Sequence, residues 1–205
     1  MDAPLPHNER TDVVGQGRSN VTSTPSTPPG PTRPLTSTAV IAGSMNFGDD
    51  TFITPPAAGR GIIERATQAG IALEVECFDV GHVVSAIRWL EEGILPPPLR
   101  INLVFGVPGG IDASPEALAA MIRPLPSGTF WTVTCIGRHH PRMLALALLH
   151  GAPGIRTGLE DVAYLRRGVL APSNAALAEM AGGLAGALGR EVATQEQTPE
   201  LLQLG

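Results

Sequence analysis

Short apolar runs alternate with helix-length amphipathic stretches along the chain from about residue 38. The apolar runs are four to eight residues long, as is typical of strands buried in a parallel sheet, and they are Ala39–Ala42, Ile71–Phe78, Ile101–Gly106, Phe130–Ile136 and Gly154–Thr157. A strand reaches a parallel neighbour only through a crossover connection, which a helix provides. The pattern therefore predicts an α/β fold with about five βα units. This number of strands fits a doubly wound sheet and is too small for a closed eight-stranded barrel.

Several stretches between and after these strands have the features of helices, and they are 81–94, Glu116–Ile122, Met143–Leu149 and one that begins near Asn174. The first carries an apolar stripe formed by Val83, Val84, Ile87, Leu90 and Ile94. Ser114 predicts an N-cap that is followed by Pro115 at the first helical position, and Asn174 predicts the cap of the last helix. Met143–Leu149 is apolar on all sides, which predicts a helix packed against more than one neighbour.

Residues 1–37 differ from the rest, because Pro, Ser and Thr dominate there and large apolar side chains are scarce. Such a segment buries too little surface to offset its ordering entropy, which predicts a disordered leader before a folded domain at 38–205. The formal net charge of −5, from 14 Lys and Arg against 19 Asp and Glu, argues against a nucleic-acid partner or an acidic membrane surface.

No apolar run approaches the length of a membrane span, and the N-terminus has no basic stretch followed by an apolar one, as a secretion signal would have. Cys77 and Cys135 lie inside apolar runs and are predicted to be core residues in a reducing compartment. Together these features predict a cytoplasmic protein.

Carboxylates and one arginine are the residues best suited to carry chemistry. Glu74 and Glu76 are two positions apart in a predicted strand, so both point to the same face, where they need a cation or a polar cavity if helices cover the sheet. Arg156 belongs to the last predicted strand, and Glu160 and Asp161 lie just beyond its carboxyl end, where α/β folds place catalytic groups. An arginine can hold one carboxylate ionised while the other binds a metal. Solvated strand carboxylates and a salt-bridging or capping role for the later residues fit the pattern equally well.

Two glycine-containing turns after strands offer polar contacts to a ligand. Gly106–Gly110 lets backbone N–H groups approach an anion, although it lacks the spacing of nucleotide-binding loops and a plain strand-to-helix turn is the better interpretation. Ser44 and Asn46 lie in the turn after the first strand and bring two further polar side chains. The histidines lack the spacing of a metal site, and no G-x-S-x-G nucleophile motif is present.

Several separate motifs occur in the order found in the β-keto acid cleavage enzymes, a family that this chain resembles over roughly residues 33–204. The motifs are the runs 43–48, 74–82, 106–110, 136–138, 156–161, 167–174 and 189–194. The resemblance implies a TIM barrel that binds a divalent metal, normally zinc. It also implies a homo-oligomer that condenses a β-keto acid with acetyl-CoA and then releases acetoacetate and a new acyl-CoA.

By the same resemblance, Glu160 is expected to be a metal ligand, and Asp161 and Arg156 are expected to be the acid/base and orienting pair. Glu74 or Glu76 is expected to contribute to the catalytic site. The residues expected to contact the β-keto acid or the CoA ester are Ser44, Asn46, Gly109 and Gly110.

One feature of the family has no counterpart in this sequence. Family members carry an H-x-H zinc pair on an early strand, and no H-x-H occurs here. We therefore expect an incomplete TIM barrel of about five βα units that lacks the N-terminal third. Two other functions stay open, namely a catalytically inactive paralogue that acts as a partner subunit and a small-anion-binding α/β protein.

Overall fold

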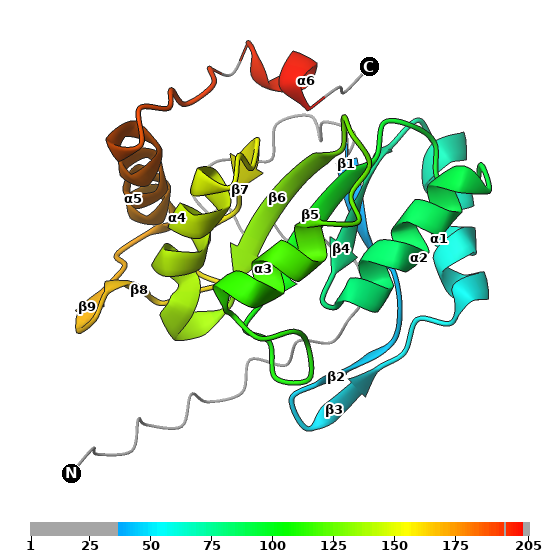
Figure 1. Cartoon of the computed structure of the whole chain (residues 1–205), viewed down its shortest axis with the longest axis horizontal. Helices are drawn as coiled ribbons and strands as arrows, with labels where there is room; N and C mark the ends of the chain where they lie inside the picture. Colours follow the sequence, from blue (N-terminus) through cyan, green and yellow to red (C-terminus); the bar gives the residue numbers. More distant parts are fainter. Residues whose placement is uncertain (1–36, 195, 203–205) are drawn as a thin grey trace, which may run out of the picture.

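A five-stranded parallel sheet forms the centre of the computed structural model, which describes residues 37–194 and 196–202 (Figure 1). The strands are β1 (Ser37–Ile41), β4 (Ala72–Cys77), β5 (Arg100–Phe105), β6 (Phe130–Cys135) and β7 (Gly154–Ile155), in the spatial order β1-β4-β5-β6-β7. All five strands that the sequence predicts are therefore present. The predicted leader lies outside the described residues apart from Ser37, which begins β1.

The helices are α1 (Pro56–Gln68), α2 (Val80–Glu91), α3 (Pro115–Ile122), the 3-10 turn η1 (Gly137–His139), α4 (His140–Leu149), α5 (Asn174–Ala187) and α6 (Thr198–Leu201). Two small antiparallel hairpins pair β2 (Met45–Phe47) with β3 (Asp50–Phe52) and β8 (Tyr164–Arg166) with β9 (Val169–Leu170). Helix α4 packs against β6, β7, α3 and α5, as its apolar surface predicts. No helix in the described part of the chain has both the length and the apolar character needed to cross a membrane.

The order of the strands in the sheet follows their order in the chain without a reversal. Right-handed crossovers that always step in the same direction place the connecting helices on one face of the sheet. The core confirms this, because Val75, Leu103 and Val133 of the strands pack together with Ile63 of α1 and Met143 of α4. The doubly wound arrangement that the strand count allowed is therefore wrong, since its strand order reverses and its helices cover both faces.

The opposite face of the sheet carries polar side chains beside a small apolar cluster around Val104. Glu74 and Glu76 lie on this face, while Leu73, Val75 and Cys77, which alternate with them, point into the helix-covered core. The register places Glu76 beside Asn102 of β5, and Asn102 beside Thr132 of β6. Asn102 is fully buried, and its Oδ1 accepts a hydrogen bond of 3.0 Å from the Thr134 hydroxyl. The predicted common face of the two glutamates is confirmed.

The buried face of α2 differs from the predicted stripe. It consists of His82, Val83, Ala86 and Trp89. Val84, predicted as apolar and inward, is 43% exposed. The Asp79 side chain caps this helix by accepting a bond of 2.8 Å from the Gly81 N–H, so the helix begins at Val80. It ends at Glu91, and Ile94 therefore lies outside it. The stripe prediction is confirmed for Val83, which is buried, and for Ile87, Leu90 and Ile94, which pack partly buried against the core. It is wrong for Val84, and it left out His82 and Trp89.

The cap of α5 is one residue earlier than predicted. Ser173 Oγ accepts a hydrogen bond of 3.2 Å from the Ala176 N–H, so Ser173 and not Asn174 is the N-cap. The Asn174 Oδ1 instead accepts a bond of 2.8 Å from the Leu159 N–H. The predicted Ser114 cap of α3 is confirmed.

Both cysteines are buried core residues with free thiols, as predicted. Burial, together with the nearby Asp161 carboxylate, raises the pKa of Cys135 to about 12. A thiol with so high a pKa carries almost no thiolate near neutrality, so Cys135 contributes packing and not nucleophilic chemistry.

A glycine substitution tests how tightly the end of β5 packs against the loop after β6. Gly106 has a φ of +80°, and a Cβ there would lie 2.5 Å from the Ile136 carbonyl oxygen. Gly128 has a similar φ of +82° but open space around it. We expect Gly128→Ala to cost about 1 kcal/mol of unfolding free energy, from the backbone conformation alone. Gly106→Ala should cost at least roughly 2 kcal/mol more, because backbone must also move. Equal losses in urea unfolding would contradict this packing.

Candidate active site

The predicted catalytic residues meet at the carboxyl end of the sheet. Glu76 lies next to the last residue of β4, and Arg156 directly follows β7. Glu160 and Asp161 lie in the loop after β7. The Arg156 N–H donates a hydrogen bond of 2.9 Å to the Val133 carbonyl, which continues the β6–β7 pairing and fixes the backbone from which the guanidinium extends. Strand geometry therefore brings together residues that are eighty positions apart in the chain.

Arg156 forms ion pairs with three carboxylates. Its Nη1 lies 2.9 Å from Glu76 Oε1, and its Nη2 contacts Glu160 Oε1 and lies 3.4 Å from Asp161 Oδ1. We call these four residues the Arg156 cluster. Their side chains differ in exposure, since Glu160 is 71% exposed, Arg156 36%, Glu76 18% and Asp161 2%. The exposed Glu160 therefore faces solvent, and Asp161 forms the buried end of the cluster.

Asp161 has an unusual affinity for protons. Burial raises its pKa, Arg156 lowers it, and Glu160 and Glu76 raise it again, so that the pKa lies at about 6. Its Oδ2 is buried and has no hydrogen-bond partner among the described residues. An acid with a pKa near neutrality exists in both protonation states at working pH, as general acid–base catalysis requires.

The pKa values of Arg156 and Glu74 also depend on burial and on the neighbouring charges. Burial would lower the pKa of Arg156, but Asp161, Glu76 and Glu160 raise it, and it lies above its usual value. Burial and the neighbouring Glu76 raise the pKa of Glu74, while Arg156 and the Asn102 amide act against this rise. The polar face thus holds more negative than positive charge, which favours protonation of its buried carboxyls.

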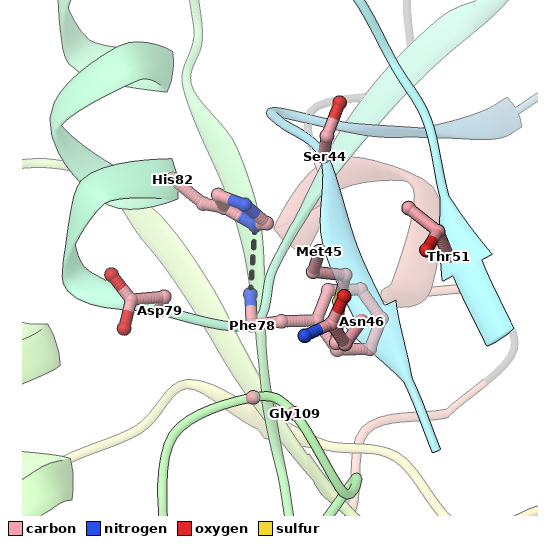
Figure 2. A pocket seen from close by; sticks show the side chains of 9 residues that line it. Ser44, Met45, Asn46, Thr51, Phe78, Asp79, His82 and Gly109 are labelled. Carbon is pink, nitrogen blue, oxygen red and sulfur yellow. Dashed lines mark hydrogen bonds between the residues drawn. The ribbon is translucent and has the colours of Figure 1, made fainter. Parts of the chain in front are cut away.

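A cavity of about 540 Å³ lies at the same end of the sheet, between the turn after β1 and the loop after β5 (Figure 2). It is lined by Ser44, Met45, Asn46, Thr51, Phe78, Asp79, His82, Gly109 and Gly110. All four residues predicted to contact the substrate or CoA line this one cavity. Backbone of the two loops is in close contact, because a Cβ on Gly109 would lie 2.2 Å from the Asn46 carbonyl oxygen and Gly48 N–H donates to Pro108 at 2.8 Å.

Hydrogen bonds within the cavity wall fix its shape. Ser44 Oγ accepts a bond of 2.9 Å from the Thr54 N–H, which holds the β2–β3 hairpin against the turn. His82 Nδ1 accepts a bond of 3.3 Å from the Phe78 N–H, drawn as the dashed line in Figure 2. Gly43 packs on the His82 ring so closely that a Cβ would lie 2.6 Å from it.

Sequence reasoning missed five residues of this wall. Two of them, Met45 and Thr51, belong to the β2–β3 hairpin, and the other three, Phe78, Asp79 and His82, lie around the start of α2. The signal that could have found these three is the capping pattern of Asp79. A helix that begins directly after this residue puts His82 in its first turn, above the end of β4.

The cavity and the Arg156 cluster are joined through β4. Glu76 belongs to the cluster, and Phe78, two residues later, lines the cavity. The Glu76 carbonyl accepts a bond of 3.3 Å from the Ala42 N–H, just before the turn that carries Ser44. The predicted site residues therefore lie along one edge of the sheet, with the exception of Glu74, which lies in the middle of β4 and is in neither the cavity wall nor the ion pairs of the cluster.

The residues present do not fit a zinc site on their own. Across residues 37–194 and 196–202, no three His, Cys, Asp or Glu side chains converge as ligands, whereas catalytic zinc is normally held by three. The Glu160 carboxylate, predicted as a ligand, contacts the Arg156 guanidinium. His139 and His140 diverge as expected, because the first contacts Arg138 and the second is buried. Zinc at Glu160 stays a prediction.

Comparison with known proteins gives a consistent result. The family model described as beta-keto acid cleavage enzyme matches residues 10–204. A 3-keto-5-aminohexanoate cleavage enzyme of Fusobacterium nucleatum is 38% identical over 167 residues, which cover 79% of this chain and 59% of that protein. A 3-dehydrocarnitine:acetyl-CoA trimethylamine transferase of Rhizobium meliloti is 34% identical, with 79% of this chain and 54% of that protein covered. The chain therefore spans little more than half the length of these curated relatives.

A solved structure supports the fold. A ternary complex of ObcA with a C4-CoA adduct and oxalate superposes with a TM-score of 0.68 at 17% identity, covering 81% of this chain and 45% of that one. At this identity the likeness concerns the fold alone. The family match over nearly the whole chain and the sequence identity to its enzymes lead to one conclusion: this chain belongs to the β-keto acid cleavage enzyme family.

Proposed function

We propose that this chain takes part in the cleavage of a β-keto acid with acetyl-CoA as co-substrate, giving acetoacetate and a new acyl-CoA. The observation that carries the proposal is the Arg156 cluster, in which one guanidinium orients a buried aspartate whose pKa is about 6. The family match and the acetyl-CoA in the name of the Rhizobium meliloti relative support this reaction class.

We further propose that the described sheet is part of a TIM (β/α)8 barrel. Consecutive parallel strands in chain order, with their helices on one face, are what neighbouring units of such a barrel have. The polar face with Glu74 and Glu76 would then face the barrel interior. Five βα units at 38–205 would form an incomplete barrel, as the sequence predicts.

The chemistry assigned to the cluster follows from the demands of the reaction. Breaking a carbon–carbon bond beside a ketone needs a group that moves a proton and a positive charge that stabilises the developing enolate oxygen. Asp161 is suited to hold and transfer the proton, because its buried carboxyl has an Oδ2 without a partner among the described residues. Arg156 holds Asp161 in orientation and supplies the positive charge. No step is assigned to zinc, because the described residues offer Glu160 without two further ligands.

The cavity is the proposed binding site for the β-keto acid and part of the CoA ester. Ser44 and Asn46 form one wall, and the glycine backbone at Gly109 and Gly110 forms the other, where the lack of side chains lets a ligand approach closely. Its volume of about 540 Å³ lies within the range of small-molecule sites.

A second candidate function is that of a catalytically inactive paralogue that acts as a partner subunit. The observation that favours it is the lack of three converging metal ligands in the described part of the chain. Under the first function the purified homo-oligomer forms acetoacetate by itself, and under the second it forms none. In both cases we propose assembly with further copies or homologous chains.

Substitution of Asp161 tests the acid–base assignment. We expect Asp161→Asn to lower kcat for acetoacetate formation at least about 100-fold, because the amide cannot exchange a proton with substrate. Asp161→Glu should retain part of the activity, and Glu179→Gln, on the exposed surface of α5, should retain all of it. The assay supplies acetyl-CoA and 3-keto-5-aminohexanoate, the substrate named for the Fusobacterium nucleatum relative. Full activity of Asp161→Asn would refute the assignment.

The raised pKa of Asp161 also predicts a pH-dependent stability. Between its ordinary value of 3.8 and about 6, the folded chain keeps this proton while the unfolded chain has lost it. Folding stability from this group is therefore present below pH 4 and is lost as the pH rises to 6. Asp161→Asn has no such proton, so its unfolding free energy relative to the wild type should rise by about 2 to 3 kcal/mol from pH 4 to pH 7. Urea unfolding at several pH values measures this difference, and a constant difference would contradict the raised pKa.

A further inference from the structure

A buried histidine lies beneath the loop that carries the Arg156 cluster. His140, the first residue of α4, has no solvent exposure. Its Nδ1 lies 2.6 Å from the Cys135 carbonyl oxygen, and its Nε2 lies 2.8 Å from the Thr157 hydroxyl. Thr157 directly follows Arg156 in the chain. Neither His140 nor Thr157 has a role in the function proposed above.

The partners of His140 determine which ring nitrogen carries the proton. A carbonyl oxygen only accepts hydrogen bonds, so the short contact with Cys135 requires a hydrogen on Nδ1. Burial lowers the pKa of His140, which keeps the ring neutral near pH 7 and leaves Nε2 without a hydrogen. Nε2 is then an acceptor, and the Thr157 hydroxyl must donate to it.

This bond is one of several that hold the loop from different elements. The Asn174 side chain at the start of α5 accepts from the Leu159 N–H at 2.8 Å. The Gly137 N–H at the start of η1 donates to the Asp161 carbonyl at 2.9 Å. The Thr157–His140 bond attaches the loop to α4, immediately beside Arg156.

We propose that His140 is a positioning residue, which in its Nδ1–H tautomer accepts the hydrogen bond of the Thr157 hydroxyl and so fixes the orientation of Arg156 and Asp161. The effect on catalysis rests on the proposed function, whereas the tautomer and the attachment of the loop are independent of it. A displacement of about 1 Å at such a site is enough to slow a reaction substantially.

His82 provides an internal control for the tautomer of His140, because its ring carries the hydrogen on the other nitrogen. Its Nδ1 accepts from the Phe78 N–H, so Nδ1 carries no hydrogen. Burial lowers the pKa of His82, although a hydrogen bond to the Ser44 backbone acts against this fall, so the ring is neutral near pH 7. Because Nδ1 carries no hydrogen, the neutral ring carries its hydrogen on Nε2. The two buried rings therefore differ in the nitrogen that carries the proton.

The first experiment is ¹⁵N NMR of the histidine rings in the full chain at pH 7. We expect His140 to be neutral with the hydrogen on Nδ1, and His82 to be neutral with the hydrogen on Nε2. Assignment of the signals uses His82→Gln and His140→Gln. A His140 ring that is protonated on Nε2, or on both nitrogens, would overturn the proposal, because it could not accept from Thr157.

The second experiment removes the Thr157 hydroxyl while keeping its volume. Thr157→Val should lower kcat for acetoacetate formation about tenfold or more and change KM for acetyl-CoA less than about threefold. Thr157→Ser keeps the hydroxyl and should restore kcat to within about threefold of the wild type. Unchanged kcat in Thr157→Val would overturn the proposal, as would equal losses in both variants.

A third measurement needs no turnover. Hydrogen exchange of the Leu159 amide, which donates to the Asn174 side chain, should become at least about tenfold faster in Thr157→Val and stay unchanged in Thr157→Ser, because a loosened loop opens this bond more often. An unchanged exchange rate in Thr157→Val would show that the hydroxyl does not position the loop. If the wild type forms no acetoacetate, the proposed function fails, while the exchange rates and the tautomers still decide the role of His140.

Discussion

The ion pairs of a single arginine assemble the candidate active site. Arg156 is in contact with Glu76, Glu160 and Asp161, so one positive charge faces three carboxylates. Protonation of one carboxylate reduces this excess of negative charge. The carboxyl that takes the proton is the most buried one, because water stabilises its charged form least. Asp161 is that group, because its side chain is 2% exposed while Glu160 is 71% exposed. The same cluster therefore brings the residues together and sets the pKa of the one best placed to transfer a proton.

Such a cluster functions only if the loop that carries it is held firmly. The division of roles between Ser173 and Asn174 serves this purpose, because Ser173 caps α5 and leaves the Asn174 amide free to bind Leu159. A cap at Asn174, as predicted from sequence, would have used that side chain within its own helix. The loop is thus fixed by the helices on either side of it, and not by its own sequence.

The sequence predicts the parts of this structure that depend on local periodicity. Alternation in β4 is sufficient to place Glu74 and Glu76 on one face, and apolar runs locate all five strands of the sheet. Helix α1 was missed because two glycines and several polar residues obscure its stripe, and because its packing on Trp89 depends on a distant helix. The role of His140 could not be predicted from sequence for the same reason, because its partners, Cys135 and Thr157, lie on other elements and no sequence spacing connects them with it.

The two faces of the sheet satisfy different demands. The helix-covered face is a continuous apolar core, and hydrophobic burial there supplies the driving force for folding. The other face carries Glu76, Asn102 and Thr132 at matching register on adjacent strands. Polar groups in such positions cost stability unless each is hydrogen-bonded, so valine or isoleucine would serve folding better. This row of polar side chains, which folding does not need, ends at the Arg156 cluster and so supports the proposal that this face serves the reaction.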